Sequence, residues 1–220
     1  MDTNLGEMSL HSRTDYTKGS LGEADVSSCG PWALLEQWLS EAVNSGISDP
    51  TAFTLSTLDS NGFPHGRIVL LRDTRNEELV FYTNYLSEKG RDVDRLGKVG
   101  ATFFWPHFER QIRVRGLAIR VSENESDDYF ASRPRGSQLG AWSSEQSSEI
   151  TSREALESQL AKQKEDFEGK EVSRPSHWGG YAIKPEVIEF WQGRSSRMHD
   201  RISCRRIPGQ KDWITARLQP

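Results

Sequence analysis

Short runs of β-branched and aromatic residues follow one another closely along this chain, and they constrain its fold more than any other feature. Such runs are typical of strands when turn residues bound them. The expected strands cover residues 52–58, 65–72, 78–83, 101–105, 111–121, 181–183, 187–191, 202–207 and 213–218. Asn61-Gly62 and Pro208-Gly209 predict hairpins between the first two and the last two of them. Many short strands with helices between them predict a mainly β fold with helical additions (α+β), a small closed or split barrel.

Four helices are expected between or before these strands. They cover residues 31–45, 87–96, 122–132 and 151–167. Pro31 suits a first helical position. Ser122 with Glu125 has the spacing of a capping box, and Thr151 with Glu154 has the same spacing.

The domain organisation is expected to be simple. Residues 1–30 are polar and predict a flexible N-terminal arm with little structure of its own. No repeat or linker divides the remainder, so residues 31–220 are expected to form one domain. Apolar residues make up only 35% of the chain, but seven Trp, nine Phe and five Tyr bury large areas, so one sizeable core is expected.

Charge and composition argue against several classes of partner and location. A net charge of −4 disfavours bulk attraction to nucleic acid or to an anionic membrane. No apolar run exceeds four residues, and the amino terminus lacks both a basic flank and an apolar stretch, so neither a membrane helix nor a secretory signal is expected. The two cysteines have no partner at metal-ligand spacing, which predicts a cytoplasmic protein without a metal site.

Two segments in the first half of the chain have features that suit a phosphate group. Tyr82-Thr83-Asn84 ends an expected strand, and Ser87-Glu88-Lys89 begins the next helix. N–H groups at a helix start, together with an ammonium group, favour phosphate binding. Arg67 and Arg72 flank an apolar strand, although regular alternation sends them to opposite faces. The alternatives are an ordinary helix cap and a core strand with solvated ends.

Arginines recur in two later segments. Residues 133–138 place two guanidinium groups and a hydroxyl in an expected Pro/Gly turn, and apolar neighbours on both sides favour a pocket. Farther on, extended geometry would put Arg197, His199 and Arg201 on one face beside Trp191. Crowded like charges are unfavourable unless an anion compensates them, so this cluster also indicates an anion site. Surface arginines and a structural histidine are the respective alternatives.

Nine segments, read together and in order along the chain, are the most specific in the sequence: residues 67–71, 82–84, 109–111, 129–135, 140–142, 146–148, 178–180, 188–193 and 197–201. Together they resemble the pyridoxamine/pyridoxine 5′-phosphate oxidases, and the similarity extends from about Tyr16 to Pro220. No nucleotide-triphosphatase, zinc-protease, serine-hydrolase or Rossmann motif is present in the sequence.

The resemblance implies a homodimeric, FMN-binding split barrel with a flavin in each of two clefts between the subunits. It also implies oxidation of pyridoxine or pyridoxamine 5′-phosphate to pyridoxal 5′-phosphate, with dioxygen as the acceptor and hydrogen peroxide as a product. Two alternatives stay open: a related flavin oxidase of another ring, such as a phenazine-type intermediate, and a non-catalytic barrel that carries flavin or pyridoxal phosphate.

The resemblance also implies which residues act. The implied FMN contacts are Arg67, Ile68, Val69, Leu70, Leu71, Arg72, Tyr82, Thr83, Glu88, Lys89, Gln111, Gln146, Ser147, Trp191 and Arg201. The implied substrate contacts are Arg13, Thr14, Asp15, Tyr16, Arg72, Tyr129, Arg133, Ser137, Arg197, Met198 and His199. Of these, Arg197 and His199 are expected to be catalytic, orienting the substrate ring and handling the proton lost from its C4′ substituent.

Three positions depart from the family's pattern. Arg72 stands where the family usually has lysine, which keeps the charge but changes the donor geometry. Glu88 stands where the family usually has arginine, and we expect this reversed charge to weaken FMN binding unless Lys89 or Arg91 compensates. Met198 replaces the usual leucine, a mild change.

Overall fold

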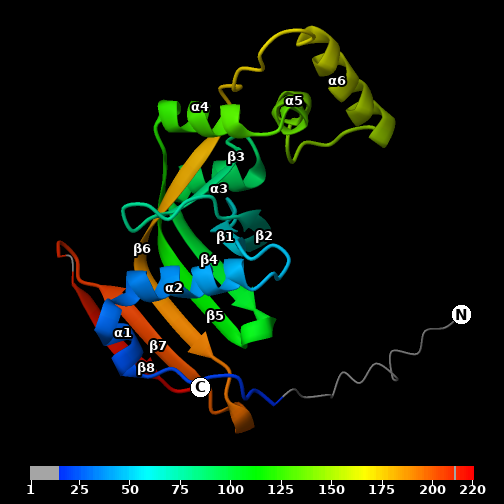
Figure 1. The fold of residues 1–220 in the computed structure, drawn as a ribbon. Helices are drawn as coiled ribbons and strands as arrows, with labels where there is room; N and C mark the ends of the chain where they lie inside the picture. Colours follow the sequence, from blue (N-terminus) through cyan, green and yellow to red (C-terminus); the bar gives the residue numbers. More distant parts are fainter. Residues whose placement is uncertain (1–14, 211) are drawn as a thin grey trace, which may run out of the picture.

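Eight antiparallel strands form one sheet in the computed structural model, which describes residues 15–210 and 212–220 (Figure 1). The strands are β1 Ala52–Leu58, β2 Pro64–Leu70, β3 Leu79–Asn84, β4 Lys98–Trp105, β5 Arg110–Arg120, β6 Trp178–Gln192, β7 Asp200–Arg206 and β8 Trp213–Leu218. Their order is β2-β1-β4-β5-β6-β7-β8, and β3 pairs with β6 outside this path. The mainly β architecture predicted from the sequence is confirmed.

Strand β6 divides the sheet because it has three neighbours. One edge of β6 pairs with β5 over nearly its whole length. The other edge is shared, since residues 178–183 pair with β3 and residues 187–192 pair with β7. The sheet therefore splits along β6 into two branches, as expected for a split barrel.

Both predicted hairpins are present. β1 and β2 pair in antiparallel register, and Gly62 between them adopts the left-handed conformation with φ +85°. The Asp59 carboxylate accepts hydrogen bonds from the backbone N–H groups of Asn61 and Phe63, each at 2.8 Å. β7 and β8 form the second hairpin, with φ +76° at Gly209. Asn-Gly and Pro-Gly chemistry at the turns accounts for both.

The prediction of two separate strands at residues 181–183 and 187–191 is wrong, because β6 is continuous through Pro185. Its pairing with β5 shifts register between Arg115 and Gly116. A Cβ at Gly116 would lie 2.2 Å from the Lys184 carbonyl oxygen, so the two backbones approach too closely there for any side chain. This irregularity accommodates the proline without ending the strand.

Six α-helices and two short 3₁₀ helices accompany the sheet in the described residues (Figure 1). They are α1 Glu23–Cys29, α2 Pro31–Asn44, α3 Glu88–Leu96, η1 Pro106–Phe108, α4 Glu123–Ser132, α5 Arg135–Ser143, α6 Arg153–Asp166 and η2 Ser195–Arg197. Helices α4, α5 and α6 gather at the end of the sheet where β6 begins. None of these helices is long and apolar enough to cross a bilayer.

Local capping chemistry explains where the predicted helices begin. The Ser122–Glu125 capping box is confirmed at the start of α4. The cap of α6 is Ser152, whose Oγ accepts the N–H of Ala155, and not Thr151 as the sequence pattern suggested. Both residues can accept such a bond, and backbone geometry selects the one nearer the helix.

Residues 23–29 form α1, so the expectation of little structure over residues 1–30 is wrong for this stretch. Leu21 and Val26 are buried in the main core, and the Asp25 carboxylate accepts the N–H of Gly22. Two buried apolar side chains in a short polar segment are too few to give a periodic sequence pattern.

Buried apolar side chains form two clusters in the described part of the chain. The larger cluster consists mainly of side chains from the strands together with side chains from α1 and α2. Trp38 of α2 meets Phe190 of β6 edge-on, at 5.4 Å between ring centroids. The smaller cluster joins α4 and α5 to the start of β6 through Phe130, Leu139 and Trp178. The smaller cluster positions the helices that line the candidate site.

Candidate functional site

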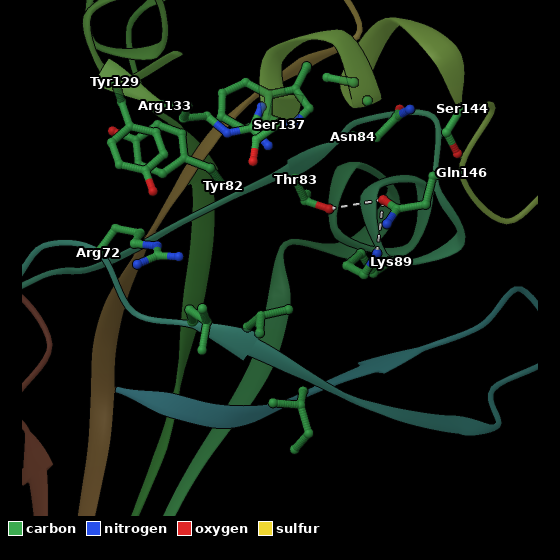
Figure 2. Close-up of a pocket in the computed structure, with 16 residues that line it drawn as sticks. Arg72, Tyr82, Thr83, Asn84, Lys89, Tyr129, Arg133, Ser137, Ser144 and Gln146 are labelled. Atoms are coloured by element: carbon green, nitrogen blue, oxygen red, sulfur yellow. Dashed lines mark hydrogen bonds between the residues drawn. The ribbon is translucent and has the colours of Figure 1, made fainter. Parts of the chain in front are cut away.

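A cavity of about 500 Å³ lies among strands β2 and β3, the start of α3, and helices α4 and α5 (Figure 2). Its lining residues are Ile68, Val69, Leu70, Arg72, Tyr82, Thr83, Asn84, Lys89, Tyr129, Arg133, Ser137, Gly140, Ala141, Ser144, Gln146 and Trp178. Figure 2 shows Arg72, Tyr129 and Arg133 toward one end, and Lys89 and Gln146 toward the other. Residues from five separate segments, all expected to contact FMN or substrate, therefore line one cavity.

One end of the cavity combines stacked aromatic rings with an unpartnered guanidinium group. The rings of Tyr82 and Tyr129 stack at 3.8 Å between centroids, and the Arg133 Cζ lies 4.4 Å from the centroid of the Trp178 ring. Nη1 of Arg133 is buried and has no hydrogen-bond partner among the described residues. Burial lowers the pKa of Arg133, and the nearby charge of Arg72 lowers it further. A guanidinium without a hydrogen-bond acceptor in the lining of a cavity favours an anionic ligand there.

At the other end, two donors converge on one acceptor. The Lys89 ammonium and the Thr83 hydroxyl both donate to Oε1 of Gln146, at 3.2 and 3.4 Å. Lys89 follows the start of α3, where Ser87 caps the helix as predicted by accepting the N–H of Gly90. Burial lowers the pKa of Lys89, and the neighbouring charge of Arg67 lowers it too. This end therefore also favours an anion.

Arg67 lies outside the cavity lining, although it is close enough to act on Lys89. Its Nη1 donates to the Thr57 hydroxyl at 2.7 Å, and Thr57 donates in turn to the Asp92 carboxylate at 2.7 Å. Glu88 also lies outside the lining, and its side chain is exposed. Burial lowers the pKa of Arg67, and the negative charge of Glu88 partly offsets this lowering. Glu88 therefore acts on the cations at this end of the cavity through its negative charge.

A second group of predicted residues surrounds the turn between β6 and β7. We call Tyr16, Trp191 and His199 the turn cluster. The rings of Trp191 and His199 are 4.7 Å apart between centroids, and Tyr16 lies 5.6 Å from Trp191 and 5.7 Å from His199. Nδ1 of His199 accepts the backbone N–H of Arg194 at 3.1 Å. The imidazole orientation is thereby fixed.

The extended geometry expected for residues 197–201 is wrong. Residues 195–197 form the 3₁₀ turn η2, and Ser196 and Arg197 have positive φ values of 55° and 60°. Arg201 therefore does not share an extended face with Arg197 and His199; its Nη2 donates to the Glu189 carboxylate at 2.8 Å. Left-handed backbone at two consecutive residues other than glycine is uncommon, and the sequence gives no signal for it.

The length of β6 separates the cavity from the turn cluster. Trp178 lines the cavity at the first residue of β6, and Trp191 lies near the end of this strand. At the usual rise per residue, the two positions are roughly 40 Å apart along the strand. No member of the turn cluster lines the cavity. One chain therefore holds the predicted site residues in two separate places.

The remaining predicted residues lie beside the turn cluster, in the core, beside the cavity, or outside the described residues. Asp15, Gln111, Met198 and Arg201 accompany the turn cluster by chain position or strand pairing. Leu71 is buried in the core, and the Ser147 hydroxyl accepts the N–H of Glu88 at 3.3 Å beside the cavity. Arg13 and Thr14 lie outside the described residues.

The helix α5 and several lining residues were missed as site elements. The segment 133–138 was expected to be a turn, but Pro134 caps α5, so Arg133 and Ser137 reach the cavity from a helix start. Asn84, Ser144 and Trp178 also line the cavity. The resemblance did include Asn84 and Trp178 in its matching segments, and Asn84 also belongs to the strand end that the sequence suggested for a phosphate group.

Two family models match the chain. Residues 39–164 match the model described as pyridoxamine 5′-phosphate oxidase. The chain belongs to this family. Residues 178–220 match a second model, described as the pyridoxine 5′-phosphate oxidase C-terminal dimerisation region. The resemblance drawn from the nine segments is thus confirmed.

Relatives match the chain over nearly its whole length. A protein named pyridoxine/pyridoxamine 5′-phosphate oxidase from Leptospira biflexa is 46% identical over 96% of this chain and 98% of its own. One of the same name from Rubrobacter xylanophilus is 47% identical over 94% of each chain. Among solved structures, PhzG from Burkholderia lata, in complex with tetrahydrophenazine-1-carboxylic acid, is 29% identical with a TM-score of 0.83, covering 91% of this chain and 98% of its own.

The unpartnered donor of Arg133 predicts an unusual stability effect. Arg174 lies in the same region, but it donates to the Asp127 carboxylate and to the Trp178 carbonyl oxygen. We expect Arg174→Met to lower the free energy of unfolding by about 1–3 kcal/mol, because it leaves both acceptors without their partner. Arg133→Met should cost less, since it removes contacts with the Trp178 and Phe130 rings but leaves no hydrogen-bond acceptor of the described residues without its partner.

Denaturant unfolding in phosphate-free buffer at one protein concentration checks this comparison. Equal or greater destabilisation by Arg133→Met would show that the Arg133 guanidinium is satisfied within the fold, and the anion site would lose its physical basis.

Proposed function

We propose that this protein oxidises pyridoxine 5′-phosphate and pyridoxamine 5′-phosphate to pyridoxal 5′-phosphate, with bound FMN as electron acceptor and dioxygen as final acceptor, giving hydrogen peroxide. Relatives of that name at 46–47% identity over nearly the whole chain support the activity. The observation that carries the proposal is the Arg133 guanidinium, which lines the cavity together with Arg72, Tyr129 and Ser137 and makes no hydrogen bond with the described residues. A phosphate group would supply the acceptors that this guanidinium lacks.

The residues at the Lys89 end fit the phosphate-bearing part of FMN. Lys89, Thr83 and Gln146 offer an ammonium, a hydroxyl and an amide beside the start of α3. An anion there would stabilise the charged form of the buried Lys89. The apolar side of β2 at residues 68–70 would lie against the flavin ring, and the cavity of about 500 Å³ falls in the range of small-molecule sites.

A second copy of the chain would complete the site. The cavity lacks the turn cluster, and the C-terminal residues match a model described as a dimerisation region. Ile68, Phe104 and Ile119 on β2, β4 and β5 are 65%, 52% and 60% exposed, which is more apolar surface than an isolated sheet face favours. We infer a homodimer in which the turn cluster of each copy, with Arg197 and Arg201, covers the cavity of the other.

The substrate phosphate would bind at the aromatic end of the cavity. Arg133, Ser137 and Tyr129 offer a guanidinium and two hydroxyl groups, and Arg72 adds a second cation. Binding energy at the phosphate, remote from the reacting carbon, would fix the pyridine ring in one orientation. FMN, when bound, supplies the hydride-accepting chemistry.

Arg197 and His199 of the other copy would then border the exposed face of the substrate ring. Because Nδ1 of His199 accepts the Arg194 N–H, the neutral imidazole carries its proton on Nε2. His199 can therefore donate a hydrogen bond to the ring or its C4′ substituent, and Arg197 adds a permanent positive charge. The role expected for His199 is therefore narrower than proton handling: it donates a hydrogen bond and orients the substrate ring.

Oxidation of a phenazine-type ring is the second candidate. The solved structure of PhzG, whose TM-score is 0.83, contains a carboxylate-bearing tetrahydrophenazine. That ligand has no phosphate. The meeting of Arg133, Tyr129, Ser137 and Arg72 in one cavity favours the phosphorylated substrate.

Anaerobic mixing of the purified protein with pyridoxine 5′-phosphate tests the function. We expect the yellow flavin spectrum to bleach and to return on admission of air, with hydrogen peroxide formed. Pyridoxine without phosphate serves as the control and should bleach the flavin far more slowly. A yellow protein that pyridoxine 5′-phosphate never bleaches would refute the proposed oxidase.

Hybrid dimers test whether the site is shared between two copies. Arg133→Leu damages the cavity half and His199→Ala damages the turn half, so each homodimer should have low activity. A mixed dimer has one doubly damaged site and one intact site. Co-expression in equal amounts should therefore restore about a quarter of wild-type activity by statistical pairing.

The restored activity is measured against the sum of the two homodimers. If each site were built within one chain, the mixture would show only that sum, and the shared-site arrangement would be wrong.

A further inference from the structure

The guanidinium of Arg133 is held by an aromatic ring and by no hydrogen bond among the described residues. Its Cζ lies 4.4 Å from the centroid of the Trp178 ring and 5.4 Å from that of Phe130. Nη1 is buried without a partner. In a site that burial already makes unfavourable for a cation, the face of an indole ring is the strongest aromatic partner available.

Trp178 is itself held firmly by the backbone around it. It is the first residue of β6, where it pairs with Asn84 of β3, and its side chain is only 7% exposed. Its carbonyl oxygen accepts a hydrogen bond from Nη1 of Arg174 at 2.8 Å, and Arg174 is anchored by the Asp127 carboxylate. The ring therefore has a fixed position from which to hold a neighbour.

The stacked tyrosines extend the same arrangement. The Trp178 ring is nearly parallel to both Tyr82, at 11°, and Tyr129, at 3°. Gly180 lets the Tyr82 ring lie against β6, since a Cβ there would come within 2.8 Å of that ring. The indole thus links the phenol of Tyr129 and the guanidinium of Arg133, the two groups at the aromatic end of the cavity.

We propose that Trp178 is a positioning residue for phosphate recognition: its indole face holds the Arg133 guanidinium in the wall of the cavity, where the guanidinium can bind the substrate phosphate. The proposal rests on the proposed function, because it assigns the phosphate-bearing substrate to the aromatic end of the cavity. Without the indole, the long Arg133 side chain can rotate to other acceptors or to water, and phosphate binding must then pay the cost of ordering it.

Binding of 4-deoxypyridoxine 5′-phosphate to the FMN-loaded protein tests the proposal by calorimetry. This analogue has a methyl group at C4′ and is not oxidised, so affinity is read without turnover. Trp178→Leu should weaken its binding by about tenfold, the effect of losing a desolvated cation–π contact. Trp178→Phe keeps a ring and should recover most of the loss.

Three controls separate positioning from a general loss of structure. Affinity for 4-deoxypyridoxine, which has no phosphate, should be the same in wild type and Trp178→Leu. Trp142→Leu removes another indole from the same apolar cluster, one over which no cation of the described residues lies, and should leave phosphate-analogue affinity unchanged. In an Arg133→Met background, Trp178→Leu should have little further effect, because the group it positions is gone.

The outcomes distinguish a failure of the proposed function from a failure of the positioning role of Trp178. If the wild-type protein does not bind 4-deoxypyridoxine 5′-phosphate, the proposed function fails. If the wild type binds it and Trp178→Leu binds it equally well, or loses both analogues in equal proportion, the positioning role of Trp178 is refuted while the function stands.

Discussion

Strand β6 is the constraint on which the rest of the site depends. It is paired along both edges, by β5 on one side and by β3 and β7 on the other, so its two ends cannot approach each other. Trp178 in the cavity wall and Trp191 in the turn cluster are fixed at these ends. The fold therefore keeps the two halves of the proposed site apart within one chain. The proposed two-fold pairing of copies would bring them together at two sites.

Charge within the cavity explains what kind of ligand it suits. Arg72, Lys89 and Arg133 line the same space, and burial lowers the pKa of both Lys89 and Arg133 before neighbouring cations add to the effect. No carboxylate of the described residues lines the cavity, and Glu88 acts on Lys89 only from outside the lining. Two anionic groups, one at each end, would balance this charge, and a phosphorylated flavin beside a phosphorylated substrate supplies them.

The sequence pattern predicted correctly those elements that depend on residues close together in the chain. The hairpin at Asn61-Gly62 and the helix capped by Ser87 both form as expected, because each depends on residues close in sequence. The continuity of β6 was missed because it depends on the close approach of Gly116 to Lys184, which are far apart in the chain. The family resemblance predicted residues of the proposed site. Which of them lie together in one chain depends on the length of β6, which the sequence pattern did not show.

A crystal structure of the protein with FMN and pyridoxal 5′-phosphate tests the central claim most directly. We expect a phosphate oxygen within hydrogen-bonding distance of the Arg133 guanidinium in one copy, and His199 from the other copy beside the same pyridine ring. A pyridoxal phosphate whose contacts all come from a single chain, or whose phosphate lies away from Arg133, would contradict it.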